Sequence, residues 1–506
     1  MDRSAVPPVC ACRRGTAAWM VGDAMRGLAA ASSGRSPGNQ PGRSDVNRRA
    51  FCLRLLALFL FTPVGLAAPG AGAAPHPVLP KHADILFLGD SITASSPYLT
   101  VLQLLLATRE PGLGVLVHNG GLNGDTAAKG LARLGSELAD RNFTAVVIGF
   151  GMNDVQRFTY RDAAATALTP GQARAASRCV ESVERIAAKL KERGIEPILM
   201  SPPLFDDMAL GLSGERAFGV NRGLGQVRDG LVRMAEAQRL RWIDLLVPGM
   251  ELTANRHRTQ PGFTLTTDRV HPNRIGSALI ALQVAVEFGI IDQAPLGETR
   301  FVAGQPTHVR AAKVEMRSGS GPGRFEFVLR PQRLPVPPDV IDVESWPLFG
   351  FPHANRFVVA VEGLAAGTYA LAIEGQPEIR ADHKAWSQGV DLAAREGWPM
   401  LAAARRLSDL VAERSELVRD RLRPVQLIDW IVQSRHRLAE RPTLEQVKEL
   451  LPRTRLSASW EIDAARRYEA ERLREAATRA RVAEIESLLR TSAPLPEIRC
   501  RFAPVP

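Results

Sequence analysis

A serine follows a short apolar run near residue 90. Residues 84–88 read Asp-Ile-Leu-Phe-Leu, and Gly89, Asp90 and Ser91 come directly after them. In open α/β sheets, ligands bind where strands end at their carboxyl edge, and a hydroxyl at the start of a helix lies at the positive end of the helix dipole. Ser91 is therefore a candidate nucleophile. The alternative is a tight turn followed by a helix cap, which the same residue types also form.

An aspartate and a histidine three residues apart could activate that hydroxyl. Asp268 and His271 form an Asp-x-x-His sequence, and Pro272 follows it. A spacing of three places both side chains on one side of a turn, so the carboxylate can hold the imidazole through Nδ1 and leave Nε2 to take a proton from Ser91. Pro272 suits the first position of a helix. The alternative is a surface histidine beside a capping aspartate.

Two further loops offer donors for a developing negative charge. Glycines occur at 119–126, directly after the apolar run 115–117, and Gly124 lets a backbone N–H approach a ligand closely. Asn153 follows the apolar run 145–148 and can donate from its side-chain amide. Fixed donors of this kind stabilise the oxyanion of acyl transfer. Taken singly, each loop is equally consistent with an ordinary turn.

Together, the four motifs resemble the sequence blocks of the SGNH hydrolase family, also called GDSL lipases and esterases. The resemblance covers residues 83–290, with the blocks in the family's order. It implies a three-layer, flavodoxin-like α/β fold with a parallel sheet, and hydrolysis of an ester or thioester without a metal or cofactor. The resemblance assigns a catalytic triad to Ser91, His271 and Asp268, and an oxyanion hole to Ser91, Gly124 and Asn153.

The elements that must position these loops alternate between strand and helix. Continuous apolar runs suit strands that are buried on both faces, and five such runs occur at 84–88, 115–117, 145–148, 197–200 and 242–246. Helical patterns lie between them, for example at 173–191 and 223–237. This alternation predicts a parallel sheet with helices on both faces.

The chain has 506 residues, of which 45% are hydrophobic, and this is enough for several domains with their own cores. A strand-rich stretch follows the predicted parallel sheet, and helical spacing dominates after it. We predict four parts: a disordered leader with a secretory signal at 1–74, the hydrolase domain at 75–295, a small β-rich region at 300–376 and a helical C-terminal region at 385–506.

The N-terminus has the order of an export signal. Arg48 and Arg49 precede an apolar stretch at 51–60, and small residues at 71–73 offer a cleavage site. This pattern predicts export to the periplasm or the outside by a signal peptide around 47–74, and the paired arginines resemble the twin-arginine type. A retained membrane anchor is the alternative. Translation starting near Val46 would account for the aperiodic residues before the signal.

The net charge of +11 is concentrated in the leader. Residues 1–74 contain nine arginines and three aspartates and so carry +6, which leaves +5 on the remaining chain. No basic stripe with interleaved aromatic residues occurs there, so we expect no nucleic-acid partner. The sequence contains no C-x-x-C or H-E-x-x-H motif, and we expect no metal site. Cys179 and Cys500 could pair in an oxidising compartment, and the sequence leaves this open.

The expected substrate is an acylated small molecule or carbohydrate. Export together with the family resemblance favours an O-acetyl group on a carbohydrate. A lipid or simple acyl esterase, or a thioesterase, is an alternative, and so is a non-catalytic binding protein on the same fold. The C-terminal region could pack on the hydrolase domain or associate with the cell envelope.

Overall fold

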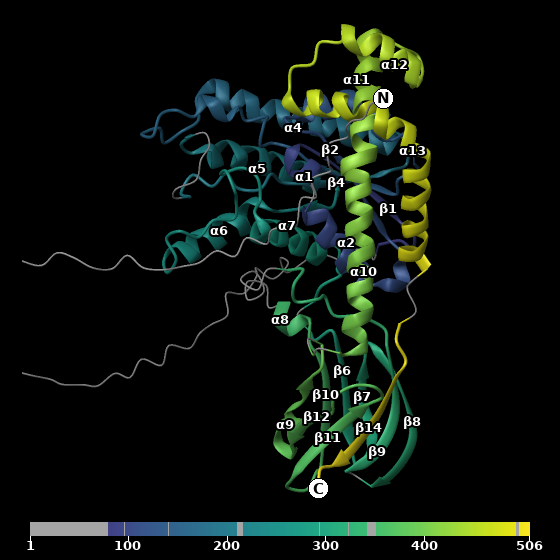
Figure 1. Ribbon diagram of the computed structural model, residues 1–506. Helices are drawn as coiled ribbons and strands as arrows, with labels where there is room; N and C mark the ends of the chain where they lie inside the picture. Colours follow the sequence, from purple (N-terminus) through teal and green to yellow (C-terminus); the bar gives the residue numbers. More distant parts are fainter. Residues whose placement is uncertain are drawn as a thin grey trace, which may run out of the picture. The chain divides into compact units, whose positions relative to one another are not determined.

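The computed structural model describes residues 79–506, apart from 96, 140, 210–215, 293, 322, 342–350, 394, 396 and 492–494 (Figure 1). The predicted leader, with its export signal around 47–74, lies outside the described residues. Among the helices that are described, none combines the length and apolar character needed to cross a bilayer.

A five-stranded parallel sheet organises the first part of the described chain, with strand order β2-β1-β3-β4-β5. Its strands are β1 (Asp84–Gly89), β2 (Leu116–Gly121), β3 (Ala145–Gly149), β4 (Glu196–Met200) and β5 (Trp242–Ile243). β1 and β3 are buried almost throughout, as strands covered on both faces must be. The parallel sheet predicted from the apolar runs is thereby confirmed. β5 is shorter than predicted because the Asp244 carboxylate accepts from the Leu246 N–H, where a helix begins.

Helices cover both faces of this sheet. They are α1 (Ser91–Ser95), α2 (Pro97–Arg109), α3 (Ala127–Glu137), α4 (Pro170–Glu192), α5 (Val220–Gln238), α6 (Leu246–His257) and α7 (Arg274–Glu287), with short 3₁₀ turns at Pro111–Leu113 and Arg157–Thr159. α2 packs against α7, whereas α4 packs against α3 and α5. This is the expected three-layer α/β arrangement. We call residues 79–291 the parallel-sheet domain.

A β-rich region follows. It contains the sheets β13-β10-β6-β7 and β12-β11-β14-β9-β8. The strands are β6 (Gly297–Val302), β7 (Gln305–Arg310), β8 (Ala312–Gly321), β9 (Arg324–Pro331), β10 (Phe357–Glu362), β11 (Thr368–Ile373), β12 (Ile379–Asp382), β13 (Val390–Asp391) and β14 (Ile498–Pro504), with α8 (Phe351–Ala354) and α9 (His383–Gln388) among them. β14 comes from the far end of the sequence and pairs between β9 and β11.

Four helices, which we call the C-terminal helices, lie in the sequence between β13 and β14. They are α10 (Pro399–Glu416), α11 (Arg423–His436), α12 (Leu444–Leu450) and α13 (Ser459–Thr491), with a 3₁₀ turn at Leu451–Arg453. A π-helical turn at Leu417–Leu422 joins α10 to α11. Pro424 has no N–H to donate to the Asp420 carbonyl four residues earlier, and Arg467 donates to that carbonyl instead.

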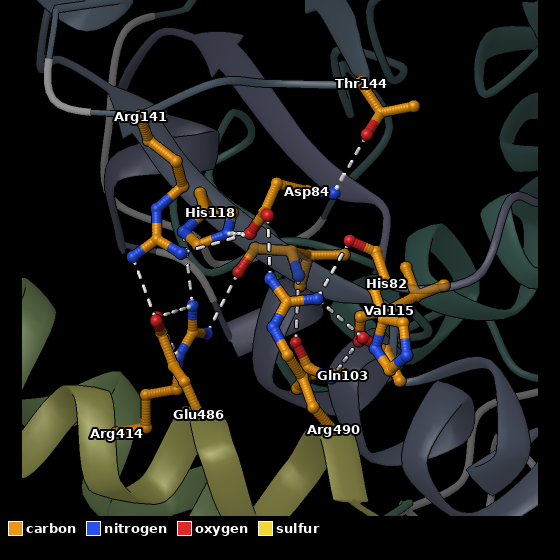
Figure 2. Close-up of polar contacts among 12 residues, drawn as sticks. His82, Asp84, Gln103, Val115, His118, Arg141, Thr144, Arg414, Glu486 and Arg490 are labelled. Carbon is orange, nitrogen blue, oxygen red and sulfur yellow. Dashed lines mark hydrogen bonds and ion pairs between the residues drawn. The ribbon is translucent and has the colours of Figure 1, made fainter.

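The C-terminal helices touch the parallel-sheet domain through arginines. Arg490 of α13 donates to the Asp84 carboxylate at 2.7 Å and to the carbonyl oxygens of His82 and Gly114 at 2.9 Å each (Figure 2). Arg414 of α10 donates to the Val117 carbonyl at 2.9 Å. A cavity of about 850 Å³ lies between β2 and α3 on one side and α10, α11 and α13 on the other.

Candidate active site

The loops that the sequence analysis singled out lie at the carboxyl ends of the parallel strands. Ser91 opens α1 directly after β1, Gly124 lies between β2 and α3, and Asn153 follows β3. Asp268 and His271 come just before α7, which Asn273 caps by accepting from the Gly276 N–H. This is the edge at which open α/β sheets bind ligands.

The structure brings Ser91, His271 and Asp268 together in one line of hydrogen bonds. The distance from His271 Nε2 to Ser91 Oγ is 2.8 Å, and the distance from His271 Nδ1 to Asp268 Oδ2 is 2.6 Å. A proton on Nδ1, facing the carboxylate, leaves Nε2 free to accept the Ser91 hydroxyl proton. These three side chains can therefore perform the proton transfer that their sequence spacing predicted.

The Asp268 carboxylate is held in its charged form. Its Oδ1 accepts from the backbone N–H groups of His271 at 2.7 Å and Val270 at 3.1 Å. Burial pushes the pKa of Asp268 upward, but the hydrogen bonds from the His271 backbone and imidazole outweigh it and hold the pKa below its usual range. An ionised Asp268 fixes the orientation of the imidazole and stabilises its protonated form.

The Asp-x-x-His loop needs an unusual backbone conformation at Arg269. This residue has a φ of 75°, which is uncommon for a residue other than glycine. Its N–H donates to Thr266 Oγ1, and its guanidinium donates to the carbonyl oxygens of Asp206 and Asp207, all at 3.1 Å. The segment after β4 therefore holds the loop that carries Asp268 and His271.

Two of the three predicted oxyanion donors are backbone N–H groups. Gly124 has a φ of 70°, so a side chain at this position would strain the backbone. Within the described part of the chain, no hydrogen-bond acceptor faces the N–H of Ser91 or of Gly124. Both groups remain available to a ligand.

The third predicted donor, Asn153, is partly engaged. Its Nδ2 donates to the Asp125 carbonyl at 2.8 Å and makes a long contact of 3.4 Å with Asp90 Oδ2. Arg157 donates to Asn153 Oδ1 at 3.1 Å, which fixes the orientation of the amide. One amide proton is thus bound to residues 122–126, the segment between β2 and α3 that we call the oxyanion loop. The other has a weak intramolecular partner that a stronger acceptor could replace.

Two carboxyl groups, of buried Asp90 and partly buried Asp154, lie next to these donors. Asp90 is 4% exposed and accepts from the Ile92 N–H at 2.9 Å, and burial raises its pKa to about 7. Asp154 accepts from the N–H groups of Ala127 and Gly151 at 3.0 and 3.1 Å, and burial raises its pKa to about 6. Asp154 thereby ties the start of α3 to the loop that carries Asn153.

Sequence analysis missed Arg133, which is 1% exposed beneath the site. Its guanidinium donates to Asp125 Oδ2 at 2.7 Å and to the carbonyl oxygens of Gly89 and Gly120 at 3.0 and 2.9 Å. It also donates to Glu137, four residues along α3. In the sequence, the only indication of this role was the spacing of four residues between Arg133 and Glu137. The same spacing is typical of ion pairs on a solvated helix face.

The two cysteines that follow the leader are both free and buried, so they do not pair with each other. Cys179 lies in α4 of the parallel-sheet domain, whereas Cys500 lies in β14. Among the residues that the structure describes, no group of three or more histidine, cysteine, aspartate and glutamate side chains is arranged to hold a metal ion.

The likeness to one solved structure extends over most of the chain. A gut microbial diltiazem-metabolizing enzyme is 20% identical, with a TM-score of 0.73, and the match covers 84% of this chain and 98% of that one. This likeness therefore includes the β-rich region and the C-terminal helices as well as the parallel-sheet domain. At this identity it shows a shared fold.

Two further solved structures match only about two fifths of the chain. An alpha/beta hydrolase enzyme from the metagenome of Lake Arreo, Spain, is 20% identical, covers 42% of this chain and 98% of that one, and has a TM-score of 0.34. An acetylxylan esterase from Geobacillus stearothermophilus is 22% identical, covers 42% of this chain and 95% of that one, and has a TM-score of 0.33.

A search of the curated proteins found no match to this chain. In the scan against protein families, residues 87–279 match the GDSL-like Lipase/Acylhydrolase family. The matched segment begins within β1 and ends within α7, so it contains all five predicted site residues. Residues 87–279 therefore form a domain that is similar to the GDSL-like Lipase/Acylhydrolase family.

Proposed function

We propose that this protein is a serine esterase in which Ser91 is the nucleophile, His271 the general base and acid, and Asp268 the residue that orients the imidazole. The observation that carries the proposal is the hydrogen-bonded line from Ser91 Oγ through both nitrogens of His271 to Asp268, with distances of 2.8 and 2.6 Å. In acyl transfer, this geometry lets one imidazole take the hydroxyl proton from the serine and then give it to the departing alcohol.

The reaction follows from the positions of these atoms. Ser91 Oγ bonds to the carbonyl carbon of the ester while His271 Nε2 takes the hydroxyl proton. The N–H groups of Ser91 and Gly124 and the Asn153 amide hold the negative oxygen of the tetrahedral intermediate. The carbon–oxygen bond to the alcohol then breaks, and His271 protonates the departing alcohol. Water repeats the sequence on the acyl-enzyme and releases the acid.

For the substrate, we propose an acetyl ester of a carbohydrate. Both triad partners are open to solvent, since the side chains of His271 and Asp268 are 39% and 40% exposed. Gly124 is also exposed. A large hydrated alcohol can therefore reach the site from solution, while the acyl group to be transferred meets the donors of Ser91 and Gly124.

A second candidate is an esterase for more apolar acyl or alcohol groups. Phe158 and Met208 are each 61% exposed. Phe158 follows Arg157, which contacts Asn153, and Met208 follows Asp207, whose carbonyl contacts Arg269. Exposed apolar side chains on loops that support the site favour contact with an apolar substrate.

The deciding experiment measures hydrolysis of chromogenic esters from acetate to long acyl chains, together with acetylated xylo-oligosaccharides and a thioester analogue. We expect activity that falls steeply beyond short chains and includes release of acetate from the sugar. Ser91→Ala should abolish the activity without changing the unfolding curve. Asn153→Ala should lower kcat by about 10²–10³, the scale for loss of one oxyanion donor.

The outcomes separate the candidates. Activity that rises with chain length assigns the protein to the apolar substrates, and preference for the thioester makes it a thioesterase. Hydrolysis that persists in Ser91→Ala contradicts the assignment of the nucleophile. A folded protein that is inactive on every substrate contradicts the proposed esterase and leaves a binding role.

We also propose that the protein is exported through a signal peptide around residues 47–74, possessing the paired arginines of the twin-arginine type. The support is the order of charged, apolar and small residues in that segment. Sequencing the N-terminus of the mature protein tests this, with cleavage expected near Ala73. Cell fractionation tests the further proposal that the C-terminal region associates with the cell envelope.

A further inference from the structure

Arg423 connects the C-terminal helices to the parallel-sheet domain close to the active-site loops. It is the first residue of α11, and its guanidinium donates to both carboxylate oxygens of Glu137, at 2.7 and 2.9 Å. It also donates to the backbone carbonyl of Gly121 at 3.0 Å. The side chains of Arg423 and Glu137 are each only 9% exposed. A two-pronged arginine–carboxylate contact of this kind fixes direction as well as distance.

Glu137 links Arg423 to Arg133. It accepts from Arg423 of α11 and from Arg133 of its own helix at the same time. Burial pushes the pKa of Glu137 upward, but the two guanidinium groups outweigh it and hold the pKa below its usual range. The carboxylate therefore stays charged and keeps both arginines in place.

Arg133 then reaches two of the strand ends that carry the oxyanion donors. It holds the carbonyl of Gly89, two residues before Ser91, and the carbonyl of Gly120 at the end of β2. It also holds the carboxylate of Asp125, which directly follows Gly124. The carbonyl of that same Asp125 accepts the Asn153 amide. The chain of contacts that starts at Arg423 thus ends at all three predicted donor segments.

The oxyanion loop needs such support from outside the sheet. β2 is an edge strand with β1 as its neighbour, and the cavity of about 850 Å³ lies along this side of the domain. The loop begins after Gly121, the last residue of β2, and contains Gly124, whose φ of 70° is a conformation that glycine adopts readily. Since an error of about 1 Å in a catalytic group can cost about 10²-fold in rate, the direction of the Gly124 N–H must be fixed by its neighbours.

We propose that Arg423 is a positioning residue for the oxyanion hole, acting through Glu137 and Arg133, so that the C-terminal helices complete the active site of the parallel-sheet domain. The inference rests on the proposed function, since it assumes that Ser91 and Gly124 donate to an oxyanion. The role of Arg423 is to hold the loop, and it has no contact with the reacting atoms.

The test is Arg423→Gln in the full chain, with Arg490→Gln as the matched control. Both arginines come from the C-terminal helices, and each donates to a carboxylate and to at least one backbone carbonyl of the parallel-sheet domain. Arg490, however, binds Asp84 at the opening of β1, the end of the strand away from Ser91. The control therefore removes a docking contact of the same kind at a site away from the loop that carries Gly124.

We expect R423Q to lower kcat for a short acyl ester by about tenfold with KM within about twofold of wild type. A boronic acid that forms a tetrahedral adduct on Ser91 should lose affinity by a similar factor, because it uses the same donors. R490Q should lower the melting temperature but leave kcat and boronate affinity within about twofold. If R423Q loses boronate affinity and kcat by a similar factor, the oxyanion donors have moved. A general loosening of the fold would lower the melting temperature without this parallel loss.

Other outcomes overturn the inference. If R423Q and R490Q lower the melting temperature equally and neither changes kcat or boronate affinity, Arg423 only docks the helices. Should R423Q fail to fold, R423K replaces it, because lysine keeps the charge but cannot span Glu137 and Gly121 together; an unchanged kcat in R423K contradicts positioning. The proposed function is checked separately, because its failure appears as wild-type activity no greater than that of Ser91→Ala.

Discussion

Asp90 lies directly before the candidate nucleophile and is almost fully buried. Its carboxylate accepts from the Ile92 N–H and contacts the Asn153 amide, so it holds the turn that presents Ser91. Burial raises its pKa to about 7, and the nearby Asp154 adds to this shift. At neutral pH, Asp90 is thus close to its own titration, and it contacts Asn153, one of the proposed oxyanion donors.

This raised pKa makes stability depend on pH. The folded protein keeps the Asp90 proton until about pH 7, whereas the unfolded chain loses it near its ordinary pKa of 3.8. The folded state binds more protons in between, so stability falls as the pH rises from about 4 to about 7. With about 1.4 kcal/mol per pKa unit, the contribution is roughly 4 kcal/mol. Asp90→Asn should therefore gain stability over wild type as the pH rises.

Urea unfolding at pH 4.5 and pH 8 measures this difference. Asp409→Asn, at an exposed aspartate of α10, is the control and should follow the wild-type profile. An Asp90→Asn variant whose stability relative to wild type is the same at both pH values would contradict the expected titration.

At the residue scale, what could be predicted was chemistry carried by short motifs. Asp268 and His271 were predicted to meet because they are three residues apart, and Ser91 was predicted from its place after the first strand. The structure places all three together. Arg133 and Arg423 could not be found in this way. Their partners are backbone carbonyls and a glutamate brought close only by the fold, and Arg423 lies 302 residues from Gly121.

At the scale of elements, the parallel strands could be predicted because burial on both faces leaves a continuous apolar run. β14 could not, because alternation in a seven-residue segment after a long helix does not reveal its neighbours. It lies between β9 and β11, and Phe502 on this strand is fully buried against the rings of Phe325, Tyr369 and Trp386.

Phe502→Ala should destabilise the protein by about 3–5 kcal/mol, since it removes a large aromatic side chain from a packed core and leaves a cavity. Denaturant unfolding measures the change. Arg501→Ala, at the exposed neighbouring position, is the control and should stay within about 0.5 kcal/mol of wild type. A Phe502→Ala variant as stable as Arg501→Ala would contradict the buried position of this ring.

At the scale of the whole molecule, the parallel-sheet domain depends on the segments that follow it. Arg109 of α2 is 2% exposed and donates to the Ala354 carbonyl at 2.7 Å and to Asn355 Oδ1 at 3.1 Å. α2 also packs against α10. The boundary predicted near residue 295 is thus crossed by contacts that bury both apolar surface and a guanidinium group.

A chain shortened to end at residue 295 should therefore fold poorly. It would leave Arg109 without the Ala354 and Asn355 acceptors and would expose the face of α2 that α10 covers. Thermal unfolding followed by circular dichroism, together with size-exclusion chromatography, should show a broad transition or aggregation. A monomer with a sharp transition close to that of the full chain would show that the domain is independent.

The position of β14 also has a consequence for synthesis. Glu497, the residue directly before β14, accepts a hydrogen bond from Arg330 of β9, which lies 167 residues earlier in the sequence. A ribosome therefore makes β9 and β11 long before the strand that joins them, and two strand edges stay open while the C-terminal helices are being made. Open edges pair readily with other chains. Translation that stops before residue 498 should accordingly give products that aggregate. The five-stranded sheet can therefore close only after all the C-terminal helices have been made.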